Sequence, residues 1–265
     1  MIARTLLLIA ILMFTLPAQA AWDAGGGLEN YQWQEYDTGN TGNPKESGLR
    51  SALFVNWTQD ADQGPLFAWR AKLYAGTVNY DTFVMCAAPC TNNGAAVSTR
   101  TDYGGATSEG QFIYRKDLGA YRLDYLGGLG LDIWRRSIRN GGGDQIEDYS
   151  ILFLRAGLRL AKSRRDPGMH GELGIKYPVS TNENAHLDSA GYTTNPALSP
   201  KGAVSGYAEL GYRINATFDV VGYYDSWRFR RSANVTVQDS SGILWNVWQP
   251  KSSMDALGAK LLVSF

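Results

Sequence analysis

After residue 20, apolar and polar side chains alternate one by one along most of the chain, and this pattern restricts the fold more than any other feature. The segment 121–133 shows it most clearly. One parity is apolar and holds Tyr121, Leu123, Tyr125, Leu129, Leu131 and Ile133, whereas the other carries Arg122, Asp124 and Asp132. Successive side chains of a β-strand point to opposite faces, so the pattern predicts strands with one apolar and one charged face.

Ten segments of this kind occur, and the connectors between them differ in length in a regular way. The segments cover residues 24–37, 46–58, 66–80, 107–116, 121–136, 148–161, 169–177, 202–214, 217–230 and 253–265. The connectors after the second, fourth, sixth and eighth segments are short, whereas three of the others are long: 81–106, 178–202 and 231–252. Short turns at one end and long loops at the other are typical of a transmembrane β-barrel, and a soluble β-sandwich has no reason for them.

We therefore predict an all-β fold, a transmembrane antiparallel up-and-down β-barrel of ten strands, with twelve strands as the alternative. An even number of strands places both chain ends at the short-turn end. Residues 234–246 lie in the last long connector, and we expect them to extend as a hairpin above the membrane without crossing it. The segment 24–37 fits the alternation least well, because Glu29, Tyr31, Trp33 and Glu35 share one parity.

Aromatic side chains gather at the short-turn end of the apolar parity. They are Trp57, Phe67, Trp69, Tyr114, Tyr121, Tyr212, Phe218 and Phe265. Amphipathic rings favour the headgroup level of a bilayer, so these side chains predict an aromatic girdle. Packing of the same rings in a soluble core does not explain why they crowd at one end of several strands.

The first twenty residues have the pattern of an export signal. Arg4 precedes an apolar run over residues 6–16, and Ala18-Gln19-Ala20 forms a cleavage site of the small-x-small type. The apolar run is too short for a membrane-spanning helix. We therefore expect a signal peptide over residues 1–20 and a single barrel domain over residues 21–265, in an oxidising compartment.

Composition argues against several classes of function. The sequence holds 25 Lys+Arg and 25 Asp+Glu, scattered along the chain, and so lacks the basic field of a nucleic-acid-binding protein. Two cysteines and two histidines argue against a zinc site, and we expect no metal or cofactor. Cys86 and Cys90 lie close together in a long connector, and we predict a disulfide between them.

The stretch 257–265 is apolar at alternate positions and ends on Phe265. It resembles the terminal strand of Gram-negative outer-membrane β-barrel proteins, and the signal, the alternation and the loop asymmetry extend this resemblance over the whole chain. The resemblance implies a location in the cell outer membrane, contact with membrane lipid and lipopolysaccharide, insertion by the barrel-assembly machinery and a monomeric state. In architecture the chain is similar to the omptin proteases and the Opc-type adhesin, but no motif assigns it to either.

The charged parity is predicted to face the lumen of the barrel. The candidate lumen-lining and solute-binding residues are Arg50, Arg70, Lys72, Arg155, Arg159, Glu172, Glu209 and Asp219. Other charges expected on the same face are Glu109, Arg115, Arg122, Asp124, Asp132, Lys176, Arg213, Asp225 and Lys260. Ten strands leave a narrow lumen, in which charges of both signs must pair or be hydrated. Two interpretations remain open, a structural plug of ion pairs or a small pore whose arginines favour anions.

From these features we expect a protein without enzymatic activity, either a narrow channel or a structural surface platform. One rival is a surface ligand-binding protein or adhesin that acts through the three long connectors. In that case Trp245 and Trp248 form part of a binding rim or an anchor at the outer interface.

The other rival is an omptin-like protease. Its candidate residues are His186 and Asp188 in one long connector and Asp81 at the start of another. Omptins use an Asp/His couple and a pair of aspartates across the barrel mouth. This sequence departs from that pattern, because its order is His-x-Asp and Asp81 has no neighbouring aspartate. The second histidine, His170, is expected beside a short turn, at the opposite end.

Overall fold

The computed structural model describes residues 20–36, 43–83, 94–139, 144–162 and 166–265. Its long strands are β1 (Ala20–Tyr36), β2 (Lys45–Gln59), β3 (Gly64–Phe83), β4 (Ala96–Asp117), β5 (Arg122–Ile138), β6 (Gln145–Ala161), β7 (Gly168–Ala185), β10 (Ser205–Arg213), β11 (Phe218–Arg230) and β14 (Lys251–Ser264). The shorter elements are the 3₁₀ helix η1 (Leu187–Ala190) and the strands β8 (Ala197–Leu198), β9 (Lys201–Ala203), β12 (Val235–Gln238) and β13 (Leu244–Val247). Within these described ranges, no helix has the length and apolar character needed to cross a membrane.

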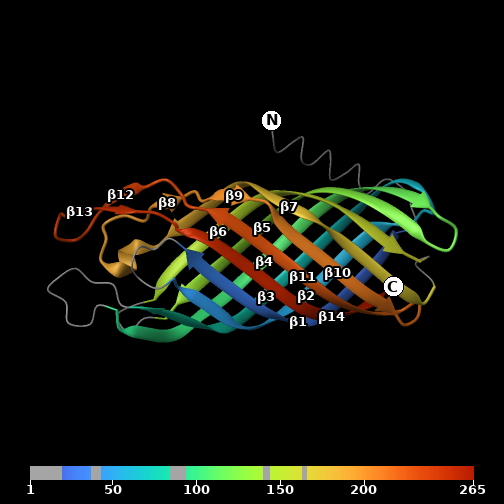
Figure 1. Ribbon diagram of the computed structural model, residues 1–265, viewed down its shortest axis with the longest axis horizontal. Helices are drawn as coiled ribbons and strands as arrows, with labels where there is room; N and C mark the ends of the chain where they lie inside the picture. Colours follow the sequence, from blue (N-terminus) through green and yellow to red (C-terminus); the bar gives the residue numbers. More distant parts are fainter. Residues whose placement is uncertain (1–19, 37–42, 84–93, 140–143, 163–165) are drawn as a thin grey trace.

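The ten long strands form one closed antiparallel barrel (Figure 1). The order runs from β1 to β7 and then through β10, β11 and β14 back to β1. β14 pairs with β1 along its whole length, from Asp23↔Ser264 to Tyr36↔Lys251. Closure leaves no strand edge open, and a bilayer demands this because hydrocarbon cannot hydrate unpaired backbone groups. The ten-strand prediction is confirmed, and the twelve-strand alternative is wrong because the extra strands β8 and β9 add only short pairings.

The apolar parity faces outward around the barrel, as predicted. Exposed fractions reach 61% for Leu53, 64% for Leu173 and 64% for Leu257, values that water would penalise and lipid does not. Of the predicted girdle, seven side chains are exposed on this surface and Trp57 is partly exposed. A continuous outward apolar band on a closed barrel is the pattern of a protein that resides in an outer membrane.

Several strands continue beyond the lengths expected from the alternation. β4 has 22 residues, about twice the number needed to cross a bilayer. We predicted residues 81–106 and 178–202 to be long connectors. This prediction is wrong for much of their length, which belongs to β3, β4 and β7. Above the membrane both faces of these strands carry polar residues, so the backbone ladder continues without an apolar parity to mark it.

In β1 neither parity is wholly apolar or wholly polar, and the structure shows which of the two faces the lumen. Glu29, Tyr31, Trp33 and Glu35 are all buried inside the barrel, with Glu29 and Tyr31 fully inaccessible. The outward parity of β1 carries Ala24, Gly26 and Leu28 and then turns polar at Asn30 and Gln32. The interior therefore combines large rings with charged groups.

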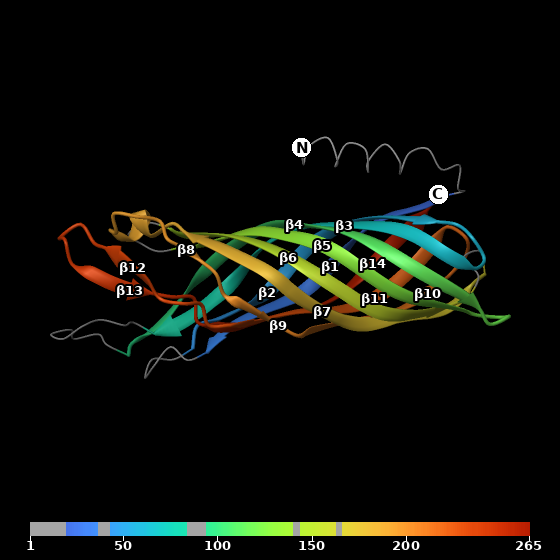
Figure 2. The same cartoon turned by 90° about the horizontal axis from the view of Figure 1, so that it is seen from above.

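The long-loop end holds β8, β12 and β13, opposite the end where the chain terminates, whereas β9 lies along the barrel wall beside β11 (Figures 1 and 2). β12 and β13 form the hairpin predicted for residues 234–246. The segment after η1 docks on this hairpin: Thr193 N donates to Gln238 O at 2.8 Å, and Ser240 N donates to Gly191 O at 3.0 Å. Two long loops thus support one another above the barrel.

Two predictions concern residues outside the described ranges. The signal peptide falls almost wholly on residues 1–19, and both Cys86 and Cys90 lie within residues 84–93. The signal peptide and the disulfide therefore stay predictions.

Candidate functional site

All eight predicted lumen residues lie inside the barrel, and ion pairs gather them around a few carboxylates. The inward parity of neighbouring strands brings these side chains into the lumen, because the period of two continues through the ladder. A solute-binding role for them remains a proposal.

The first group centres on Glu29, whose side chain is fully buried. Its Oε1 accepts from Arg50 Nη2 at 2.6 Å and Nε at 2.9 Å, and its Oε2 accepts from Lys72 Nζ at 2.5 Å. Tyr223 OH donates to the same Oε2 at 2.8 Å. The Arg50 guanidinium also stacks 3.7 Å from the centroid of the Tyr31 ring, so it contributes charge and packing together.

The second group centres on Glu172, from β7. Three guanidinium groups contact its carboxylate: Arg70 at 2.6 Å, Arg155 at 2.6 Å and Arg159 at 2.7 Å. Arg155 also pairs with Glu109 at 2.9 Å. Mixed signs at these distances neutralise one another, and neutralisation is what a low-dielectric interior requires.

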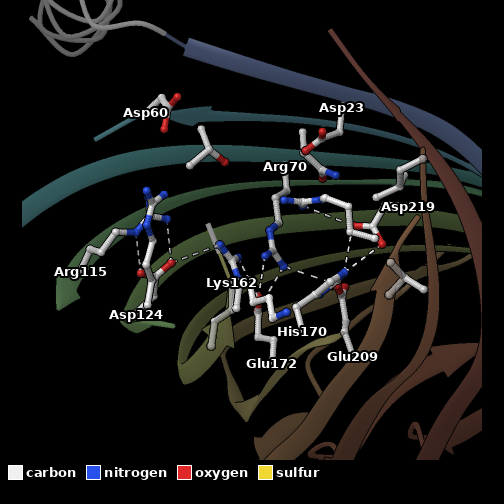
Figure 3. A pocket seen from close by; sticks show the side chains of 18 of the residues that line it. Asp23, Asp60, Arg70, Arg115, Asp124, Lys162, His170, Glu172, Glu209 and Asp219 are labelled. Carbon is white, nitrogen blue, oxygen red and sulfur yellow. Dashed lines mark hydrogen bonds and ion pairs between the residues drawn. The ribbon is translucent and has the colours of Figure 1, made fainter. Parts of the chain in front are cut away.

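Two small cavities remain between these groups, of about 120 Å³ and about 90 Å³. The larger one opens toward the short turns, and most of the side chains that line it are charged (Figure 3). Within it His170 Nε2 lies 2.9 Å from Asp219, which also faces Arg213 at 3.4 Å. Arg70, Glu209 and Lys260 line both cavities, so the two cavities adjoin one another. We call them together the vestibule, and they are large enough for a few waters.

An aromatic layer closes the lumen on the long-loop side of the vestibule. Trp33 on β1 and Tyr149 on β6 come from opposite walls, yet their ring centroids are 5.9 Å apart. Trp227 on β11 packs edge-on against Phe153 on β6 at 5.0 Å, and its Nε1 donates to Asp132 on β5 at 3.0 Å. Because rings from opposite walls touch, side chains fill the lumen at this level.

A third charged group lies beyond the aromatic layer, where the outward residues are polar. Arg136 on β5 is 3.1 Å from Glu147 and 3.2 Å from Glu35, and Glu46 is 3.7 Å away. Tyr103 OH donates to Glu46, and Gln249 Nε2 donates to Glu35 at 3.3 Å. These side chains are all buried, so they pack against one another in the outer half of the lumen.

Sequence reasoning missed several of these residues for two reasons. Glu29 was not predicted to face the lumen, because β1 has no apolar parity around it to mark the opposite face. The register with β2 places Glu29 directly opposite Arg50. The inward parity of the strands also includes Arg136, Glu147 and Glu35. Extension of the same alternation to these positions would have predicted them as lumen residues. His170 is beside a short turn as expected, but it belongs to the vestibule.

The proposed catalytic residues at the long-loop end have different partners from those expected. His186 Nε2 lies 2.9 Å from Asp148 Oδ2, a carboxylate that we did not predict as its partner. Arg135 donates to both oxygens of Asp148, at 2.7 and 2.8 Å, and this interaction holds the pKa of Asp148 below its usual value. Asp81 accepts from Ser98 Oγ at 2.8 Å. Among the described residues, no group of acids, histidines or cysteines has the arrangement to hold a metal ion.

The hairpin above the barrel is ordered by one carboxylate. Asp239 accepts hydrogen bonds from the Ser241 side chain at 2.6 Å and Trp245 Nε1 at 2.8 Å, and these donors lower the pKa of Asp239 to about 2. The turn holds Ile243, Leu244 and Trp245 exposed, with exposed fractions of 54%, 67% and 44%. The hairpin β12–β13 that carries them lies beyond the barrel, at the far end from the short turns (Figure 1).

Comparison with known proteins identifies the fold and no closer relationship. No protein-family model matches the sequence, and a search of curated proteins finds no match either. Among solved structures, the outer membrane protease OmpT from Escherichia coli matches with a TM-score of 0.58 and 13% identity, over 95% of this chain and 99% of that one. The transport unit of the autotransporter AIDA-I from Escherichia coli matches with a TM-score of 0.46 and 10% identity, over 98% and 96%. Neisserial surface protein A matches with a TM-score of 0.37 and 11% identity, over 92% and 99%.

The closed ten-stranded barrel, its outward apolar band and the likeness to OmpT agree with one another. Identity of 13% relates the folds and does not transfer an activity. The chain has the fold of the outer-membrane β-barrels of Gram-negative bacteria.

Proposed function

We propose that this protein is a sealed outer-membrane barrel that acts as a platform for its long loops rather than as a pore. The observation that carries the proposal is the contact of Trp33 and Tyr149 across the lumen, with ring centroids 5.9 Å apart. The Glu29 group below this contact and the Arg136 group above it are buried and paired. Loss of one partner from such a buried pair leaves an uncompensated charge and is strongly destabilising, so these groups are suited to a structural role in the interior.

The loops support the second half of the proposal. The segment after η1 and the β12–β13 hairpin are joined by hydrogen bonds, which hold the hairpin in one position above the membrane. Exposed Ile243, Leu244 and Trp245 at its turn provide an apolar contact surface. A fixed scaffold with a preformed apolar tip is suited to recognition at the cell surface, because little ordering is needed on binding.

Conductance of the purified protein in planar lipid bilayers tests the seal. We expect no unitary current steps from the native protein. Arg70→Ala and Arg155→Ala should also stay silent, because both arginines lie on the short-turn side of the aromatic layer. Regular current steps in the native protein, with an ion selectivity that changes in these variants, would refute the proposal of a sealed platform and support the anion pore instead.

Replacement of residues 235–247 by a short Gly-Ser linker tests whether the hairpin is a separate module. We expect a barrel that still folds and resists denaturation by detergent at room temperature, as followed by gel mobility. A variant that cannot fold would show that the hairpin belongs to the scaffold itself.

A second candidate function is proteolysis, favoured by the His186–Asp148 contact of 2.9 Å near the barrel mouth and by the likeness to the fold of a protease. The bidentate Arg135 contact on Asp148 counts against it, because this carboxylate is already neutralised. Intact cells that display the barrel should be assayed with fluorogenic dibasic peptides. Cleavage that disappears in His186→Ala would establish the protease, and equal rates in both strains would dismiss it.

A further inference from the structure

Glu183 on β7 lies beside the Arg136 group, which already holds three carboxylates for one guanidinium. Arg136 contacts these three at 3.1 to 3.7 Å: Glu35, Glu46 and Glu147. The register of β6 and β7 places Glu183 directly opposite Tyr149, whose hydroxyl donates to Glu147 at 3.1 Å. With Glu183 the buried carboxyl groups exceed the positive charge that the described residues bring to this level.

No cation of the described chain reaches Glu183. Its exposed fraction is 1%, its Oε2 has no hydrogen-bond partner, and none of the ion pairs within the described ranges includes it. On the other side of β7, Glu183 is opposite the apolar Leu198 of β8. The stretches that follow β1, β3 and β5, at residues 37–42, 84–93 and 140–143, contain no lysine or arginine. An ionised Glu183 would therefore be a buried charge without a counter-ion.

A carboxyl group in this position keeps its proton, because an isolated charge in a low-dielectric interior costs far more than a neutral acid. The outward neighbours of Glu183, Asn182 and Asn184, are polar, so Glu183 lies beyond the apolar band. Burial and the nearby Glu147 carboxylate raise the pKa of Glu183 well above its usual value. Burial also raises the pKa of Glu147, and the guanidinium of Arg136 limits that rise. Glu183 is therefore the acid that holds a proton, while Glu147 pairs with Arg136.

We propose that Glu183 holds a proton at neutral pH and that this proton makes the outer end of the lumen a pH-sensitive lock. The titratable and charged groups around Glu183 come from the surrounding strands: Glu35 on β1, Glu46 on β2, Tyr80 on β3, Tyr103 on β4, Arg136 on β5, and Glu147 and Tyr149 on β6. Loss of the proton would add a second negative charge beside Glu147, and both carboxylates would then compete for one guanidinium. Because Gln249 donates to Glu35 in the same group at 3.3 Å, the base of the β12–β13 hairpin is attached to this lock.

Infrared spectroscopy of the barrel in lipid vesicles at neutral pH tests for the proton. The carbonyl band of a protonated carboxylic acid is separate from the bands of carboxylates, and Glu183→Gln should remove one such band from the native spectrum. The control Asp144→Asn removes an exposed carboxylate at the same end of the barrel and should leave these bands unchanged. If Glu183→Gln does not fold, Glu183→Met takes its place here and in the unfolding experiment. Identical spectra of the native protein and the Glu183 variant in this region would overturn the proposal.

Urea unfolding of the same proteins as a function of pH tests the lock. The folded barrel binds the Glu183 proton more tightly than the unfolded chain, in which a glutamate has a pKa of about 4.3. Relative to Glu183→Gln, the native barrel should therefore lose stability as the pH rises above about 4.3, and its unfolding constant should rise about tenfold per pH unit toward neutral pH. The two proteins should differ least near pH about 4, and Asp144→Asn should follow the native protein throughout.

A difference in stability between the native barrel and Glu183→Gln that does not change with pH would also overturn the proposal. It would show that Glu183 binds a proton no more tightly in the folded barrel than in the unfolded chain. The role of the lock rests on the sealed barrel proposed above, and bilayer conductance tests that seal. A barrel that conducts and a Glu183 that is ionised are therefore distinguishable failures.

Discussion

Replacement of Glu29 by glutamine probes the centre of the first ion-pair group. In the native barrel the Glu29 carboxylate accepts four hydrogen bonds, two of them from Arg50, which has an exposed fraction of only 2%. A glutamine of the same size keeps one acceptor oxygen and removes the negative charge. The guanidinium of Arg50 then has no counter-ion and no access to bulk water.

The expected cost follows from this burial. Removal of one partner of a buried ion pair costs about 3–5 kcal/mol, because the remaining charge is left uncompensated. Lys72 adds less to this cost, since its side chain is 16% exposed and can be hydrated. The double variant Glu29→Gln, Arg50→Met should lose about 1–3 kcal/mol less than the sum of the two single variants. The control Asp62→Asn removes an exposed partner of Arg122 and should cost less than about 1 kcal/mol.

Urea unfolding of the barrel in lipid vesicles, followed by tryptophan fluorescence, gives these free energies. The Glu29→Gln variant should unfold at a clearly lower urea concentration than the native protein and the Asp62→Asn control. A loss below about 1 kcal/mol, or strictly additive effects in the double variant, would show that Glu29 and Arg50 are not a desolvated pair.

Two further predictions concern packing and pH. In Gly130→Ala the new Cβ would lie 2.3 Å from the Phe153 ring, so we expect a loss of about 1–3 kcal/mol in the same urea assay, whereas Gly127→Ala on the same strand has open space and should be neutral. Equal effects of the two alanines would refute the packing of Phe153. The pKa of Asp239 is lowered to about 2, so its stabilisation of the hairpin is present above pH about 4 and is lost as the pH falls through about 2. The indole N–H signal of Trp245 in NMR should report this transition, and a midpoint near pH 4 would contradict it.

The barrel itself could be predicted from the sequence because a bilayer imposes a period of two on each spanning strand. This alternation alone predicted that Arg70 and Glu172 face the lumen. Above the membrane the alternation is absent, because outward residues such as Asn182 and Ser137 are polar too. The extensions of β4 and β7 were therefore not predicted.

Partners across the lumen were beyond prediction for a different reason. The contact of Trp33 with Tyr149 joins residues far apart in the chain and depends on strand tilt and stagger, which no local pattern encodes. His186 was expected to act with Asp188, yet the register of β6 and β7 brings it to Asp148. The choice between plug and pore depends on such contacts, so the sequence left both interpretations open.

Side-specific thiol labelling tests the sealed lumen most directly. In a background with Cys86→Ser and Cys90→Ser, Asn56→Cys places a thiol in the vestibule and Ser240→Cys places one on the exposed hairpin. A membrane-impermeant maleimide is added on the long-loop side of oriented proteoliposomes. We predict rapid labelling at position 240 and none at position 56 until detergent exposes the short-turn end. Labelling of position 56 from the long-loop side, at a rate comparable with position 240, would contradict the account.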